Sequence, residues 1–131
     1  MKKTLIDTSA WVEYFKGNRA VANFIHSREE YSVYIIGPVI SELIQGMKTE
    51  NEKESFTYAL ESINRIQIAD QDWLDAGLAG SHLRSKGITV PFIDLIIYSA
   101  ARNNQCSICT LDKHFQVINK NLKNKVEILE F

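Results

Sequence analysis

The chain has 131 residues, of which 45% are hydrophobic and 24% are charged, and its formal net charge is −1. This length favours a single domain over residues 1–131, with enough buried surface for a proper core. The balanced composition excludes a disordered or fibrous chain, and the small net charge argues against a protein that coats nucleic acid through a large positive excess.

Apolar residues alternate along the chain between short extended runs and runs with helical spacing. Thr8 or Ser9 is expected to cap the first helix, and Pro38 suits the first turn of a later one. In chain order the predicted elements are strand 4–6, helix 8–16, helix 19–27, strand 31–36, helix 38–47, helix 50–63, strand 65–69, a helix that Asp72 caps and Lys86-Gly87 closes, helix 91–103, strand 107–111 and strand 126–129.

Strands that alternate with helices are typical of a parallel sheet covered on both faces. We therefore predict an α/β fold, namely a three-layer α/β/α sandwich with a central, mainly parallel sheet of about five strands. Residues 95–101 of the helix over 91–103 are apolar nearly all round, so this helix should be buried.

Four acidic residues follow or flank the predicted strands. Asp7 lies at the carboxyl end of the first strand, Glu42 in the helix after the second, and Asp112 just past strand 107–111. Asp94 lies in the first turn of the helix that precedes this strand. Because that helix should run antiparallel to the strand, its first turn should lie at the same edge of the sheet. Because ligands bind beyond the carboxyl ends of parallel strands, we expect the four acids to meet at one edge of the sheet.

Carboxylates crowded together repel one another, and a divalent cation is the usual remedy. Mg²⁺ or Mn²⁺ suits oxygen ligands, and such an ion can orient a water and neutralise the leaving group of a phosphodiester. Taken singly, each acid also has a structural interpretation as a cap, a turn residue, a solvated helix face or a complement to a helix dipole. The coincidence of all four at one edge favours the metal site.

Four segments in this order resemble the PIN-domain family, and most closely the VapC-type toxins of bacterial and archaeal toxin–antitoxin pairs. The matching segments are Leu5–Trp11, Pro38–Leu43 with Gly46, Leu83–Gly87 followed by Pro91–Ala101, and Cys109–Phe115. Each segment is short, but together they span nearly the whole chain at the expected spacing.

The resemblance implies a metal-dependent endoribonuclease that uses Mg²⁺ or Mn²⁺, forms a homodimer and is neutralised by a small antitoxin. It carries over Asp7, Glu42, Asp94 and Asp112 as the acidic set. We interpret Asp7 and Asp94 as direct ligands, with Glu42 and Asp112 serving a second ion, outer waters or the general-base role. The supporting hydroxyls that it implies are Thr110 and, near Asp7, Ser9. The closing motif has His114 where many relatives carry a further acid.

The two cysteines and the N-terminal residues indicate in which cellular compartment the protein is expected. Asp7 interrupts the N-terminal apolar run before a leader peptide could form, and no apolar run approaches the length of a membrane span. Cys106 and Cys109 have the C-x-x-C spacing of a redox motif. In a strand, however, this spacing places their side chains on opposite faces, so we interpret them as buried, inert thiols. We expect a cytoplasmic protein without membrane association.

Three other functions fit parts of this pattern. A receiver-type signalling domain is also a small α/β sandwich, although it needs an acceptor Asp at the end of a middle strand and a lysine after the last. A catalytically inert module that binds RNA or protein could keep the fold without the chemistry, and a DNA-directed nuclease could share the architecture.

Overall fold

The computed structural model of the chain describes residues 2–29 and 32–130, and it confirms the α/β fold. All strand pairs are parallel, and the sheet has the order β3-β2-β1-β4-β5. The strands are β1 (Lys3–Ile6), β2 (Val33–Ile36), β3 (Asn64–Ile66), β4 (Cys106–Cys109) and β5 (Ile128–Leu129).

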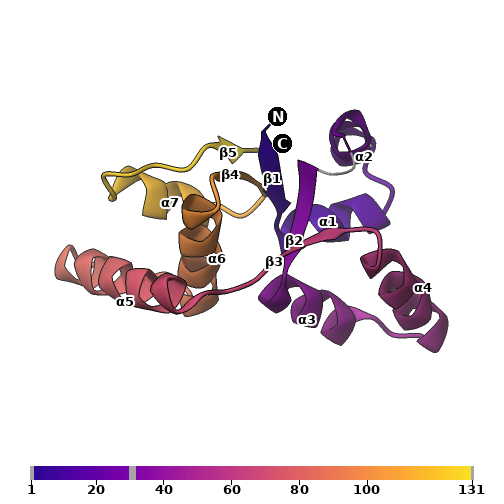
Figure 1. Ribbon diagram of the computed structural model, residues 1–131, viewed down its shortest axis with the longest axis horizontal. Helices are drawn as coiled ribbons and strands as arrows, with labels where there is room; N and C mark the ends of the chain where they lie inside the picture. The colour runs from indigo at the N-terminus through magenta and orange to yellow at the C-terminus, as the bar shows by residue number, and fades with distance from the viewer. Residues whose placement is uncertain (1, 30–31, 131) are drawn as a thin grey trace.

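Helices cover both faces of this sheet. Figure 1 shows α1 to α4 on one side of it and α5 to α7 on the other, which gives the three layers expected from the sequence. The helices are α1 (Thr8–Phe15), α2 (Arg19–Ser27), α3 (Gly37–Gly46), α4 (Glu50–Leu60), α5 (Asp70–Ser85), α6 (Phe92–Asn103) and α7 (His114–Lys120).

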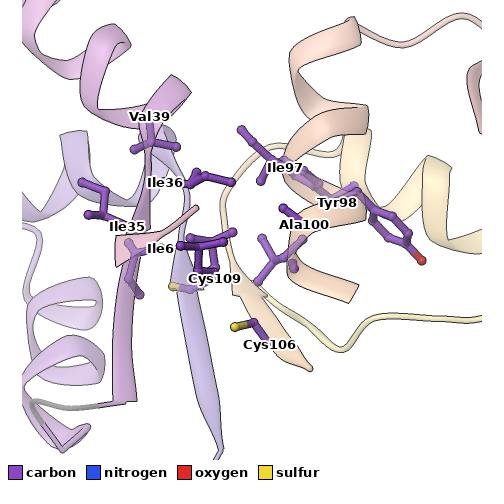
Figure 2. Close-up of a cluster of buried hydrophobic side chains, with 14 of the residues drawn as sticks. Ile6, Ile35, Ile36, Val39, Ile97, Tyr98, Ala100, Cys106 and Cys109 are labelled. Carbon is purple, nitrogen blue, oxygen red and sulfur yellow. The ribbon is translucent and has the colours of Figure 1, made fainter. Parts of the chain in front are cut away.

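The core lies between the sheet and α6 on one face, and between the sheet and α1 to α3 on the other. Leu5 and Ile6 are both fully buried although they are consecutive on β1. Successive strand side chains point to opposite faces, so both faces of the central strand are covered. Figure 2 shows apolar side chains of β1, β2 and β4 packed near those of α6, among them Ile97 and Ala100.

The strand order places two loops side by side. Ile6 pairs with Cys109 at the carboxyl ends of β1 and β4, and Asp7 donates its backbone N–H to the Cys109 carbonyl at 3.0 Å. From β1 the chain builds the sheet towards β3, and it then crosses over to add β4 and β5 on the other side. The ends of β1 and β4 therefore lie where the order of the strands reverses, which is where open parallel sheets form crevices.

Most predicted elements are confirmed within a few residues, but an additional helix and the cap of α5 differ from expectation. The segment after Asp112 forms α7, which the sequence did not predict. Asp72 is not the N-cap of α5: Ala69 holds that position, and Asp72 lies in the first turn, where its carboxylate accepts the Ala69 N–H at 2.8 Å. The helix expected over 50–63 ends at Leu60 because the chain turns into β3.

Smaller differences concern the ends of strands. The strand expected over 31–36 begins at Val33, and Tyr31 lies outside the described residues. Cys106 and Cys109 are both free and buried, and burial raises the pKa of the Cys109 thiol to about 12, which agrees with inert thiols. Within residues 2–29 and 32–130, every helix is too short or too polar to cross a membrane.

Candidate metal centre

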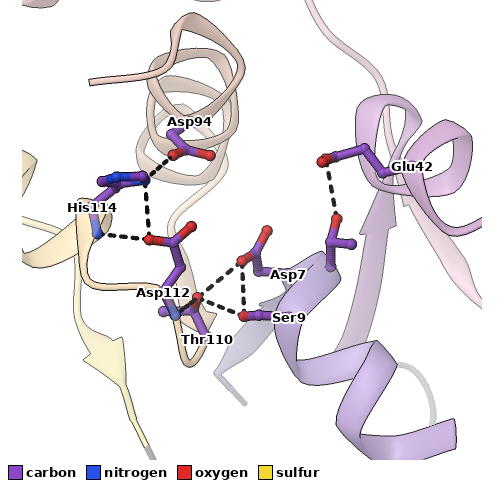
Figure 3. A network of polar contacts seen from close by, with 8 residues as sticks. Asp7, Ser9, Glu42, Asp94, Thr110, Asp112 and His114 are labelled. Atoms are coloured by element: carbon purple, nitrogen blue, oxygen red, sulfur yellow. Dashed lines mark hydrogen bonds and ion pairs between the residues drawn. The ribbon is translucent and has the colours of Figure 1, made fainter. Parts of the chain in front are cut away.

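Asp7 is the most deeply placed acid of the predicted set. It joins β1 to α1, and only 5% of its surface is exposed. Its Oδ2 accepts hydrogen bonds from Ser9 Oγ at 3.2 Å and from Thr110 Oγ1 at 2.9 Å, as Figure 3 shows. The carboxylate is therefore held in one orientation by groups that follow β1 and β4.

The same two hydroxyls fix the loop after β4. Ser9 Oγ accepts the Leu111 N–H at 2.9 Å, and Thr110 Oγ1 accepts the Asp112 N–H at 2.9 Å. Each hydroxyl thus donates its proton to Asp7 and accepts a backbone N–H from the loop. This network links the position of Asp112 to that of Asp7, although the two residues are far apart in the sequence.

Asp94 and Asp112 meet around the ring of His114. His114 Nδ1 lies 2.8 Å from Asp94 Oδ2 and 3.1 Å from Asp112 Oδ1, and the backbone N–H of His114 donates to Asp112 Oδ1 at 2.9 Å. One ligand atom from each of the three residues lies within 4.8 Å of the others. Asp94 is brought there by the first turn of α6, and His114 by the start of α7.

Burial and mutual repulsion disfavour the charged forms of these acids. The pKa of Asp94 is raised to about 6, mainly because burial removes water and also because the charges of Asp112 and Asp7 lie nearby, although the hydrogen bond from His114 opposes the shift. Burial likewise raises the pKa of Asp7, against hydrogen bonds that include the one from Thr110. The site thus holds negative charge that its own residues only partly offset.

Glu42 stands apart from the other three acids. It is exposed on α3, and its Oε1 accepts a hydrogen bond from Thr8 Oγ1 at 3.1 Å. Figure 3 shows Glu42 away from Asp112, with Asp7 lying between the two in that view. The hydroxyls of Thr8 and Ser9 serve the site rather than cap α1, whose N-cap residue is Asp7, so the cap expected from the sequence was wrong.

Two contacts of the site were missing from the sequence analysis. The sequence placed His114 near the acids but gave it no contact with them, and it assigned no role to Thr8 beyond capping. The available signal was local: an Asp two residues before a histidine can accept that residue's N–H and turn the chain into a helix. The roles of Asp7, Glu42, Asp94 and Asp112 as ligands stay predictions.

The fold and the site together define a class: three-layer α/β/α proteins with acidic side chains gathered where neighbouring central strands end. The family model for the PIN domain matches residues 4–121, and the chain belongs to this family. The matched segment contains all four predicted acids and both supporting hydroxyls.

The chain is also similar to known proteins in sequence and in fold. The chain is 28% identical over 120 residues to Ribonuclease VapC11 of Mycobacterium tuberculosis, a match that covers 87% of this chain and 90% of the relative. Its fold matches VapBC-1 from nontypeable Haemophilus influenzae with a TM-score of 0.79 at 19% identity, covering 97% and 96% of the two chains. VapBC2 from Rickettsia felis, bound to a DNA fragment from its promoter, matches with a TM-score of 0.78 at 18% identity, covering 98% of each chain.

Proposed function

We propose that this chain is a divalent-metal-dependent endoribonuclease, the toxin of a toxin–antitoxin pair, acting in the cytoplasm on RNA phosphodiesters. The observation that carries the proposal is the meeting of Asp94 and Asp112 beside His114, with Asp7 linked through Thr110 to the backbone of Asp112. Membership of the PIN domain family and the ribonuclease names of the curated relatives support it. The whole of residues 1–131 would serve as the single nuclease domain.

The donor set fits a hard divalent cation. Carboxylate oxygens are the ligands that Mg²⁺ and Mn²⁺ accept most readily, and the raised pKa of Asp94 marks negative charge that a cation would neutralise. Asp94, Asp112 and Asp7 would hold the ion. When bound, such an ion supplies Lewis-acid polarisation of the phosphate and neutralises charge that develops on the leaving oxygen.

The chain's own residues would orient the reactants around that position. Ser9 and Thr110 keep the Asp7 carboxylate in one orientation, because each hydroxyl is itself fixed by a backbone N–H. Glu42, which accepts a hydrogen bond from Thr8 on the far side of Asp7 from Asp112, is our candidate for orienting the attacking water and accepting its proton.

Two surfaces support the proposed protein partners. A groove of about 700 Å³ between α1, α3 and α4 is lined by apolar residues, Phe15 and Met47 among them, and by polar and charged ones that include Glu42. A segment of a small antitoxin lying there would reach the site. Exposed Trp73 and Phe92, whose rings stack 6.2 Å apart, offer an apolar surface on α5 and α6 that a second copy could cover in a homodimer.

The receiver-type alternative does not fit the sheet. Such a domain needs an acceptor Asp after a middle strand, but the acid after the third strand, Asp70, follows the edge strand β3 and is exposed at the start of α5. The PIN domain match also favours the nuclease. The DNA-directed and inert alternatives are separated from the proposal by experiment.

Cleavage of labelled RNA and of labelled DNA by the purified protein tests the proposal. We expect RNA cleavage in Mg²⁺ or Mn²⁺ that EDTA abolishes and that Asp94→Asn or Asp7→Asn lowers at least about a hundredfold, since weakening a metal's ligand set has effects of that order. Asp70→Asn, a charge-matched control at an exposed position, should cleave like the unaltered protein. Cleavage in EDTA, or cleavage by a folded Asp94→Asn protein at the original rate, would refute the proposal. Cleavage of DNA alone would favour the DNA-directed nuclease. Absence of cleavage by the folded protein would favour the inert module.

A further inference from the structure

His114 differs from the other histidines because its ring faces two acids of the site. His26 instead pairs through Nε2 with the Tyr14 hydroxyl at 3.0 Å, and His82 is exposed on α5. We propose that His114 is a nitrogen ligand of the cation, and that it makes the site select divalent transition-metal ions, Mn²⁺ among them, over Mg²⁺. This inference rests on the proposed function, because it concerns the same metal site.

The ring is anchored where it stands by the start of α7. The backbone N–H of His114 donates to Asp112 Oδ1 at 2.9 Å, and the next residue, Phe115, is fully buried. The ring itself is 46% exposed, so one side faces Asp94 and Asp112 while the other remains open to water. The backbone therefore presents Nδ1 to the carboxylates without help from a distant segment.

The spacing of the donor atoms suits one ion. Two ligands that bind at about 2.1 Å along perpendicular axes lie about 3 Å apart. The distances from His114 Nδ1 to Asp94 Oδ2 and to Asp112 Oδ1 are 2.8 Å and 3.1 Å. These are separations of neighbouring ligands in a six-coordinate site, so an ion could meet all three groups with little movement of the backbone.

The chemistry of the His114 imidazole decides which metal ions the site prefers. Ionised carboxylates can only accept hydrogen bonds, so Nδ1 carries the proton when it bonds to Asp94 and Asp112 without a metal. A neutral imidazole can hold its one proton on Nε2 instead, which frees Nδ1 as a ligand. Imidazole nitrogen binds first-row transition-metal ions, Mn²⁺ the most weakly of the series, whereas Mg²⁺ binds oxygen and keeps its waters. A nitrogen ligand added to the carboxylates therefore favours the transition-metal ions over Mg²⁺.

A direct nitrogen ligand has a spectroscopic signature that a merely structural histidine lacks. Pulsed electron paramagnetic resonance of Mn²⁺ bound to the purified chain detects magnetic coupling to a ligating ¹⁴N nucleus. We expect that coupling in the unaltered protein and in the control His82→Ala, and its loss in His114→Ala and His114→Asp. His114→Asp supplies oxygen in place of nitrogen, so it should still bind Mn²⁺ even if His114→Ala folds poorly.

Calorimetric titration with Mn²⁺ and with Mg²⁺ provides the second measurement. We expect His114→Ala to weaken Mn²⁺ binding at least about tenfold, since even outer partners of a metal site have effects of that size, and to change Mg²⁺ binding much less. Mn²⁺ bound without ¹⁴N coupling, or an equal loss for both ions, would overturn this inference and leave the proposed nuclease standing. Failure of the unaltered protein to bind either ion would overturn both.

Discussion

Asp94 lies within reach of two other carboxylate charges, those of Asp112 and Asp7, while only 14% of its side chain is exposed. Its pKa of about 6 lies above the ordinary value of 3.8, so between these pH values the folded protein binds more protons than the unfolded chain. The contribution of this group to the free energy of unfolding therefore falls as pH rises through that window. At neutral pH the ionised carboxylate destabilises the metal-free protein.

Replacing Asp94 by Asn should stabilise the metal-free protein, because the amide has no charge to desolvate. At about pH 7.5 we expect Asp94→Asn to raise the free energy of unfolding by about 1–3 kcal/mol, since each unit of pKa shift corresponds to about 1.4 kcal/mol. At about pH 4 the gain should vanish because Asp94 is then protonated in the folded state. Urea denaturation in EDTA at both pH values measures this, with Asp70→Asn as control. An increase in the free energy of unfolding of equal size at both pH values, or a decrease at pH 7.5, would show that the ionised Asp94 carboxylate does not destabilise the folded protein.

Residue placement was predictable from the sequence only as far as topology determines it. Asp7 and Asp112 follow strands that end side by side, and Asp94 begins the helix before β4, so their arrival at one edge follows from the fold. The contact of Asp94 with His114 and the separation of Glu42 depend on side-chain conformations and on the start of α7. No periodic pattern in the sequence encodes those details.

At the scale of single elements, the start of α5 depends on one buried carboxylate. Asp72 is 2% exposed; its Oδ2 accepts the Ala69 N–H at 2.8 Å and its Oδ1 accepts the Asn103 amide at 2.7 Å. The bond to Ala69 begins α5, and the bond to Asn103 joins α5 to the end of α6. The carboxylate that begins α5 thus also joins two of the helices on one face of the sheet, α5 and α6.

Removing that carboxylate should weaken the fold. We expect Asp72→Ala to lower the free energy of unfolding by about 1–2 kcal/mol, because the Ala69 N–H at the start of α5 loses its acceptor and the Asn103 amide loses one of its two acceptors. Asp70→Ala, two residues earlier and exposed, should stay within about 0.5 kcal/mol of the unaltered protein. Denaturant titration of both variants checks this difference, and equal stability of the two would mean that Asp72 is not the anchor described.

The unpredicted helix α7 shows where reading elements from sequence fails. Its buried apolar residues are Phe115 and Ile118, too few for helical spacing to stand out over seven residues. Its start depends on Asp112 accepting the His114 N–H, a contact between neighbours that a turn could make equally well. Longer elements such as α6, with a continuous apolar stretch, were predictable within a residue or two.

At the scale of the whole molecule, the strand order determines which segments meet to form the site. Because β1 and β4 are neighbours in the centre of the sheet, segments about a hundred residues apart in the sequence meet at one edge. The helices on both faces hold those strands in place, and the site draws on β1, β4, α6 and α7 together. The central claim is that Asp7, Asp94 and Asp112 converge to hold a divalent cation.

Anomalous diffraction from crystals of the chain grown with Mn²⁺ tests that claim most directly, because it locates the ion without reference to activity. We predict an anomalous peak within direct or water-bridged reach of the Asp7, Asp94 and Asp112 carboxylates, absent from crystals of Asp94→Asn. A peak only at exposed acids elsewhere, or no peak at this edge of the sheet at saturating Mn²⁺, would contradict the account.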